Sequence, residues 1–226
     1  MNNQSKSLQI RSRHFLAACG TLVIAQFGSA GKLHASVLYE SGNFTGTVTG
    51  AGGQSVNSAQ FLGWRFTLPV ASTITEFGAT LYLDGGSGTL FGAIAEVDSL
   101  ADFPDTPNTF AALVSAVLSP PVGYVAGSLT SASVSVVLPS GTYALIFGGG
   151  RFGAGATPTG GIANIGSSPS PANVMLLGQT GTDTWGHFHN GNYYYVRAEP
   201  VPEPSGAALL LIGLAACGVF RRKHAV

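Results

Sequence analysis

Two histidines and one aspartate near the end of the chain have residue types that can bind a metal ion. His187 and His189 are two residues apart, so on a strand their side chains point to the same side. Asp183 precedes His187 by four residues. The residues from 187 to 192, however, read as a loop. Asp183 is also the one carboxylate near the two histidines. The pattern therefore does not predict a metal centre or another cofactor, and the three residues are candidates for a direct test.

A second group that could bind a cation is Asp98, Asp102 and Asp105, whose carboxylates are ligands that calcium prefers. Their spacing of four and then three residues differs from the signature of calcium-binding loops. The segment also contains two prolines, which break regular structure. We interpret residues 98–108 as a solvated acidic loop, and a calcium-dependent binding module is the alternative.

Aromatic residues near the same end could offer a flat surface to a sugar ring. Trp185 precedes a run of three tyrosines, in which Tyr193 and Tyr195 share one face of a strand and Tyr194 takes the other. Trp185, Tyr193 and Tyr195 are therefore candidate carbohydrate-binding residues, with at least one face of the tyrosine strand expected in the core. The chain has no Gly-x-Ser-x-Gly or His-Glu-x-x-His motif, and we expect no enzymatic activity.

Alternating threonines allow a third kind of binding site. Thr180, Thr182 and Thr184 alternate, as do Thr45, Thr47 and Thr49, which is the spacing of ice-binding ladders. Two isolated triplets do not form a repeated flat array, and threonine is common in strands for other reasons. Ice binding is therefore a less favoured alternative.

The charges of residues 36–199 exclude some partners. This stretch contains three basic and nine acidic residues, which leaves a formal charge of −6 in a chain whose overall charge is zero. No lysine occurs from residue 33 to residue 221. Binding to nucleic acid or anionic lipid depends on clustered Lys and Arg, so neither is expected as a partner.

The same stretch reads as short strands separated by turns, without a long helix. A Pro-Ser-Gly turn at residues 139–141 leads into Tyr143, which resembles the tyrosine corner of Greek-key sandwiches. Residues 73–83 and 89–97 are expected to pair as a hairpin, and the glycine-rich residues 147–172 are expected to form a long loop. Together these features predict an all-β protein with a single β-sandwich of jelly-roll or Greek-key type. The remaining expected strands are 37–44, 60–68, one within 109–118 that follows a helical turn at residues 110–113, 124–129, 133–138, 174–177 and 193–197.

The N-terminal segment has the pattern of a secretory signal peptide. Basic residues precede an apolar run from Phe15 to Phe27, and small residues follow at Ala30 and Ala35. We assign residues 1–35 to the signal peptide and favour cleavage after Ala35 over cleavage after Ala30. The two cysteines, Cys19 and Cys217, lie outside residues 36–199, so no disulfide is expected in that domain.

The C-terminal residues 200–226 have three parts with different physical properties. Two prolines around one glutamate interrupt regular structure, an apolar segment follows, and a basic cluster comes last. An apolar helix from Gly206 to Phe220 rises about 22 Å, which is short against a hydrocarbon core of about 30 Å. The basic cluster is expected to stay on the cytoplasmic side. The residues of the first and third parts are Val201, Pro202, Glu203 and Pro204, and then Arg221, Arg222 and Lys223.

This tail resembles the PEP-CTERM sorting signal of Gram-negative bacteria, which the membrane protease exosortase recognises. The resemblance covers the tail alone, and Pro202, Glu203 and Pro204 carry it. It implies an exported protein that is transiently anchored in the inner membrane, processed near the motif, and delivered to the cell surface or an exopolysaccharide matrix. The same tail occurs on proteins of unrelated activity, so it implies no activity for the domain.

Overall fold

The computed structural model describes residues 36–46, 48–50, 55–85, 87–123, 128–165, 175–188 and 191–202. Within these ranges the protein is all-β, as the sequence predicts, with strands and no helix. The described part accordingly contains no helix long and apolar enough to cross a membrane. The expected signal peptide and the expected sorting helix from Gly206 to Phe220 lie outside the described residues.

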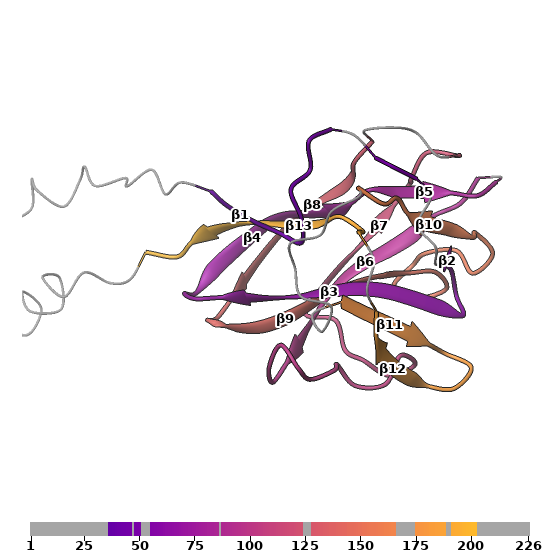
Figure 1. Ribbon diagram of the computed structural model, residues 1–226. Helices are drawn as coiled ribbons and strands as arrows, with labels where there is room; N and C mark the ends of the chain where they lie inside the picture. Colours follow the sequence, from indigo (N-terminus) through magenta and orange to yellow (C-terminus); the bar gives the residue numbers. More distant parts are fainter. Residues whose placement is uncertain are drawn as a thin grey trace, which may run out of the picture. The chain divides into compact units, whose positions relative to one another are not determined.

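The strands form two large sheets and one small sheet, in which all strand pairs are antiparallel (Figure 1). The four-stranded sheet has the order β1 (Val37–Glu40), β13 (Tyr194–Pro200), β4 (Ser72–Ala79) and β8 (Thr130–Leu138). The six-stranded sheet has the order β12 (Thr184–His187), β11 (Met175–Gln179), β3 (Gln60–Leu68), β9 (Gly141–Gly148), β6 (Leu90–Val97) and β7 (Val114–Leu118). The small sheet has the order β2 (Ser55–Val56), β10 (Gly160–Ile162) and β5 (Leu81–Leu83).

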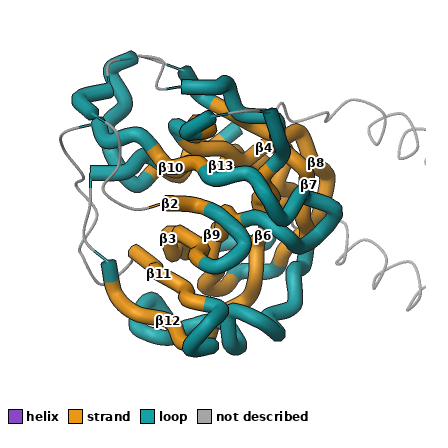
Figure 2. The backbone as a smooth tube through the Cα atoms, turned by 90° about the vertical axis from the view of Figure 1, so that its right-hand side faces the viewer, coloured by secondary structure: helices purple, strands orange, loops and turns teal. Residues whose placement is uncertain are grey.

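The main core lies between the two large sheets, an arrangement consistent with the expected β-sandwich (Figure 2). Phe77 and Val196 enter it from the four-stranded sheet, and Phe66, Ile94 and Leu145 enter it from the six-stranded sheet. All five side chains are at most 3% exposed. Burying apolar side chains of this size stabilises the fold by roughly 1.5–3 kcal/mol each, relative to leaving them exposed.

The six-stranded sheet is also buried on its other face. A second cluster there contains Phe61, Phe91, Phe110 and Ile146, and we call it the outer cluster. Strand β6 is therefore apolar along nearly its whole length, because its residues face the core on one side and the outer cluster on the other. The chain between β6 and β7, which includes the acidic loop of residues 98–108, contributes Phe103 and Phe110 to this cover.

The hairpin expected between residues 73–83 and 89–97 is wrong. Strand β4 pairs with β13 and β8, whereas β6 pairs with β9 and β7 in the other large sheet. The first segment is divided at Thr80, whose hydroxyl donates to the carbonyl oxygen of Ala163 at 2.8 Å. The second segment, strand β6, is buried on both faces. It therefore lies in the interior of a sheet with a strand on each side, and not in a two-stranded hairpin.

The long loop expected over residues 147–172 is also partly wrong, because it contains β10. Glycine allows this strand to approach Tyr82 closely. A Cβ on Gly160 would lie 2.2 Å from the Tyr82 carbonyl oxygen, and one on Gly161 would lie 2.6 Å from the Tyr82 hydroxyl. A glycine run that reads as a loop therefore forms the middle strand of the small sheet.

Several local predictions are confirmed and a few boundaries change. The Tyr143 hydroxyl donates to the Pro139 carbonyl oxygen at 2.9 Å, as expected for a tyrosine corner. The Phe110 amide donates to the Thr106 carbonyl oxygen at 2.9 Å, so the turn lies at residues 106–110. No helical turn forms at the expected residues 110–113, and the strand begins at Val114. No strand covers Ser128 or Leu129, and the rest of the strand expected at 124–129 lies outside the described residues. The first strand ends at Glu40, four residues earlier than expected.

Candidate functional site

The metal candidates do not form one site in the described part of the chain. Asp183 lies in the turn before β12 with a φ of 53°, and its Oδ1 accepts from the Asn108 amide at 3.0 Å. His187 lies at the other end of β12, in a strand and not in the expected loop. Its Nδ1 is 3.1 Å from an Arg65 guanidinium nitrogen, and His189 lies outside the described residues. No three His, Cys, Asp or Glu residues among those described could hold a metal ion together.

Trp185 is half-buried and serves as a contact for the acidic loop. Its ring lies over Gly178 of the neighbouring strand, where a Cβ would come within 2.5 Å of the Trp185 Cζ3 atom. The indole N–H donates to the Asp105 carbonyl oxygen at 2.7 Å. The indole ring packs edge to face against the Phe110 ring, with the ring centroids 6.0 Å apart. The polar group and part of the ring are thus engaged within the protein.

Tyr193 and Tyr195 do not form the open aromatic surface that the sequence suggested. Their side chains are 4% and 5% exposed, and their rings stack with centroids 6.0 Å apart. Both hydroxyls donate to carboxylates, Tyr193 to Glu40 at 2.8 Å and Tyr195 to Glu76 at 2.7 Å. Burial is the main reason that the pKa of Tyr195 rises to about 12. Tyr195 belongs to the four-stranded sheet and Tyr193 directly precedes its strand β13, whereas Trp185 belongs to the six-stranded sheet. The tyrosines and the tryptophan therefore lie in separate clusters, and the fold does not bring the three candidates together.

The alternating threonines likewise do not share one flat surface in the described part. Thr180 and Thr182 lie in the turn between β11 and β12, and Thr184 begins β12. The Thr182 and Thr184 hydroxyls bond to each other at 2.7 Å, whereas the Thr180 hydroxyl donates to the Ser58 carbonyl oxygen at 3.2 Å. Thr47 of the other triplet lies outside the described residues.

Two arginines hold the segment between β6 and β7 against the outer cluster. Arg65 is 1% exposed, donates to the Asp102 carbonyl oxygen, and has its guanidinium carbon 5.1 Å from the centre of the Phe103 ring. Arg151 donates to the carbonyl oxygens of Pro107 at 2.5 Å and Phe110 at 2.9 Å. Burial lowers the pKa of both guanidinium groups. Both arginines therefore hold this segment through its backbone carbonyl oxygens.

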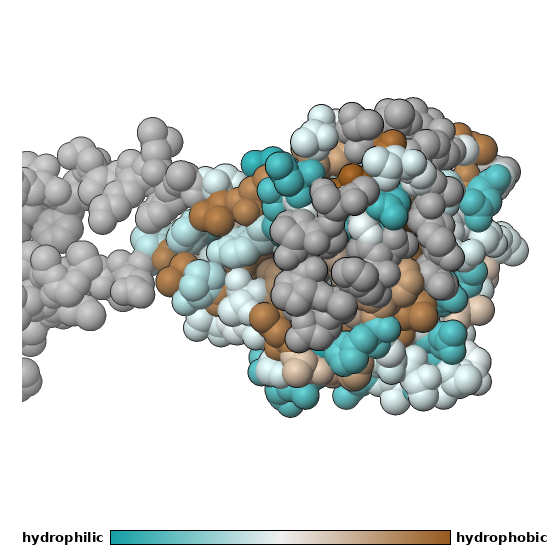
Figure 3. Space-filling model, viewed as in Figure 1, coloured by the Kyte–Doolittle hydropathy of each residue, from teal (hydrophilic) through white to brown (hydrophobic). Residues whose placement is uncertain are grey.

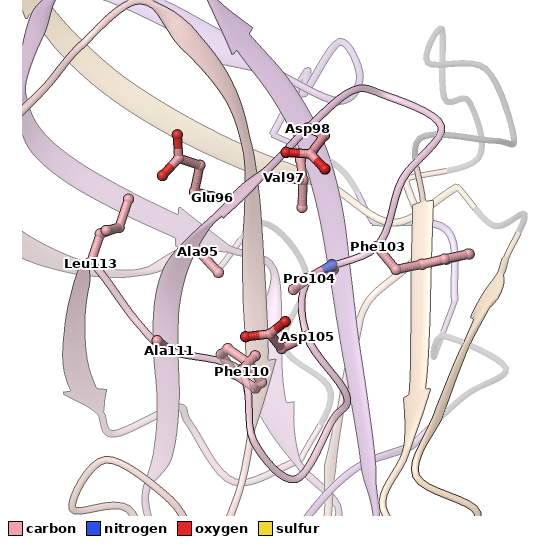
Figure 4. A pocket seen from close by; sticks show the side chains of 10 residues that line it. All are labelled: Ala95, Glu96, Val97, Asp98, Phe103, Pro104, Asp105, Phe110, Ala111 and Leu113. Carbon is pink, nitrogen blue, oxygen red and sulfur yellow. The ribbon is translucent and has the colours of Figure 1, made fainter.

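This arrangement forms a cavity of about 270 Å³ between the end of β6 and the acidic loop (Figure 4). The carboxylates of Glu96, Asp98 and Asp105 line it, and Figure 4 shows them spread around the space rather than converging on one point. Carboxylate oxygens can accept hydrogen bonds from hydroxyl groups or attract a cation. The other lining residues are Ala95, Val97, Phe103, Pro104, Phe110, Ala111 and Leu113.

Arg65, Arg151 and Glu96 are functional residues of this region that the motifs and spacings of the sequence do not indicate. A signal was present for the arginines, because they are two of only three basic residues in residues 36–199. Alternation along β3 also places Arg65 on the same face as Phe61, which indicates that this face is covered.

The residues of the sorting motif lie at the limit of the described chain. Val201 is the last described residue whose backbone bonds to the domain. Its amide donates a hydrogen bond to the Ala71 carbonyl oxygen at 2.8 Å. Pro202 is exposed. Glu203, Pro204 and the basic cluster from Arg221 to Lys223 lie outside the described residues.

No protein-family model matches the chain, and no curated protein sequence matches it. Among solved structures, a chain of the T13 viral particle of IBDV is 11% identical with a TM-score of 0.27, covering 76% of this chain and 41% of that one. A chain of the infectious bursal disease virus Gx strain is 12% identical with a TM-score of 0.26, covering 76% of this chain and 42% of that one. The protein thus spans about two fifths of the length of these viral chains, and a likeness at this level does not bear on fold or function.

Proposed function

We propose that this protein is a non-enzymatic cell-surface or extracellular-matrix protein of a Gram-negative bacterium, processed by an exosortase-type membrane protease and associated with exopolysaccharide. Residues 1–35 would direct export, residues 36–199 would form a Greek-key or jelly-roll sandwich, and residues 200–226 would be the sorting tail. The tyrosine corner at Tyr143 supports the Greek-key assignment.

The observation that carries this proposal is the position of the Pro-Glu-Pro motif relative to the end of the fold. The last backbone bond described between the chain end and the domain is at Val201, and the motif begins at the exposed Pro202. A protease needs an extended segment outside the folded domain, so this position suits processing near the motif. The pairing of β1 with β13 also supports the proposal, because Val37 lies opposite Ala198. The first described strand, β1, therefore begins at the same end of the sheet at which the last strand, β13, ends.

The test is expression of the full chain in strains with and without exosortase, followed by cell fractionation and mass determination of the C-terminus. We expect a shortened surface form in the first strain and an unprocessed inner-membrane form in the second. The double variant Pro202→Ala/Pro204→Ala should stay unprocessed, whereas the control Pro200→Ala leaves the motif intact and should be processed normally. Equal processing and location in the two strains would falsify the proposal.

A second candidate function is carbohydrate binding in the cavity beside the acidic loop, because three carboxylates line it together with apolar side chains. Sugar hydroxyls would donate to these carboxylates. Binding of purified protein to matrix polysaccharide should weaken in Asp105→Asn and remain unchanged in Asp84→Asn, an exposed carboxylate that does not line the cavity. If Asp105→Asn and Asp84→Asn bind the polysaccharide equally well, both with and without a calcium chelator, carbohydrate binding in this cavity is refuted.

A further inference from the structure

The edge strands of the two large sheets are protected to very different degrees. Strands β1 and β12 are four residues long, β1 ends at Glu40, and β12 ends at His187. Strand β7 is five residues long and is followed by two prolines after Ser119. Strand β8 is nine residues long and contains no charge, proline or glycine. Short length, charge and proline are common protections against edge-to-edge pairing, and β8 has none of these three. Its one irregularity is a shift of register in its pairing with β4, where Val134 and Ser135 lie opposite Thr75.

Strand β8 lies in a long part of the chain that has no charge. Residues 106–150 contain no Asp, Glu, Lys, Arg or His, although residues 36–199 as a whole are acidic. Strands β7 and β8 both fall in this stretch and lie side by side at one flank of the sandwich (Figure 2). We call β7 and β8 together the neutral flank. Its outward side chains on β8 are three serines and Val137, which is 61% exposed.

The core is not fully closed at this flank. Val114 and Ala116 of β7 point inward, as do Val134 and Val136 of β8, and these side chains pack against the main core while remaining only half-buried. Other exposed apolar side chains lie elsewhere, for example Val37 and Leu38 on β1, where brown side chains are visible in Figure 3. Those of β1, however, sit on a short edge next to a carboxylate.

We propose that the neutral flank binds a second copy of this chain, with β8 of one copy pairing with β8 of the other in antiparallel orientation around a two-fold axis. An antiparallel edge is self-complementary, since each copy offers the same donors and acceptors in reverse order. No described strand pairs with the outer edge of β8. The domains formed by residues 36–199 carry a formal charge of −6 in each copy and repel one another, and neither strand of this flank carries a charged side chain.

A second copy fits the chemistry of this flank better than other partners do. A polysaccharide would need aromatic or charged side chains to contact, and the outward side chains of β8 are serines and a valine. A strongly charged protein would meet no charged side chain on β8 itself, and the Glu76 carboxylate beside Ser131 is already paired with Arg197. Pairing of two β8 strands would join the four-stranded sheets of both copies and cover the half-buried valines. This inference does not depend on the proposed export or processing.

Oligomeric state and cross-linking of the full chain test the proposal. In detergent, sedimentation equilibrium should show dimers of the unaltered chain, and Val137→Lys should raise the dimer dissociation constant at least about tenfold, because the two-fold axis places two lysines in one interface. The matched control is Leu38→Lys, which adds the same charge at a 43% exposed position on the opposite edge of the same sheet. It should leave the dimer unchanged.

Cross-linking in intact cells provides a measurement that does not depend on detergent. In a chain whose Cys19 and Cys217 are replaced by serine, Ser133→Cys should give a disulfide-linked dimer after mild oxidation, and Leu38→Cys should not. Ser133 and Leu38 are both exposed, and far-ultraviolet circular dichroism checks that each variant folds. The proposal is overturned if the unaltered chain is monomeric at about 100 µM, a concentration well above typical specific affinities. It is also overturned if the flank variants behave like the β1 controls.

Discussion

Replacing Arg151 by alanine should release the chain segment that covers the outer cluster. Arg151 donates to two carbonyl oxygens of that segment and lies over the rings of Phe110 and Phe152, with its guanidinium carbon 4.3 and 4.7 Å from their centres. A hydrogen bond from a charged donor contributes about 1.5–3 kcal/mol, and a cation–π contact about 0.5–2 kcal/mol. Part of this gain offsets the desolvation of the half-buried guanidinium, which also lowers its pKa. We expect Arg151→Ala to lower the free energy of unfolding by about 3 kcal/mol.

Urea unfolding of the two variants Arg151→Ala and Arg197→Ala measures this difference. Arg197 is a matched control because its ion pair with Glu76, at 3.3 Å, is at the surface with the arginine side chain 44% exposed. Such a pair contributes at most about 1 kcal/mol. Hydrogen exchange should also speed up in residues 98–113 of Arg151→Ala, with little change in the four-stranded sheet. Equal destabilisation by both substitutions, or unchanged exchange in residues 98–113, would refute the assigned role of Arg151.

Three further predictions concern single residues. Gly160→Ala should destabilise the domain by about 3 kcal/mol in urea unfolding, because its Cβ would meet backbone, whereas Gly50→Ala, with open space around it, should change stability by less than about 0.5 kcal/mol. Tyr143→Phe should cost about 1 kcal/mol through loss of the bond to Pro139, and an unchanged melting temperature would contradict that role. The pKa of Glu76 is lowered. Burial alone would raise this pKa, but the hydrogen bonds that the carboxylate accepts outweigh burial. Its contribution to stability is therefore present at neutral pH and is lost as pH falls below 4.5 through the folded pKa, so Glu76→Gln should make stability fall less steeply in that range.

Local features of the fold could be predicted from the sequence, whereas the partners of strands could not. The turn at Pro139 and the tyrosine corner depend on five consecutive residues, and the strand at 60–68 shows its apolar side chains directly. The predicted hairpin is wrong because residues 73–79 do not pair with the next strand along the chain. Their observed partners in β8 and β13 are far away along the chain, and local sequence does not encode such contacts.

For the candidate site residues too, the residue type can be read from the sequence, whereas the tertiary contacts cannot. The residue type of Trp185 was informative, but its accessibility depends on the acidic loop some 80 positions earlier in the chain. The contact of His187 with Arg65 joins residues 122 positions apart, so its effect on a metal site could not be foreseen from spacing. Tyr193 and Tyr195 share one face, as their spacing predicts, yet the covering of that face by Phe44 and neighbouring side chains is a result of tertiary packing.

The pairing of β1 with β13 determines how the domain responds to mechanical force. A pull applied between Val37 and Pro200 acts at the same end of two antiparallel strands, so it opens their hydrogen bonds one after another instead of loading them all at once. Such a pair unzips under a small force, and the four residues of β1 give little resistance. The interior strands β4, β3 and β9 do not lie directly between the two points of attachment. A tension at the two ends of the domain would therefore detach β1 first and leave the main core folded.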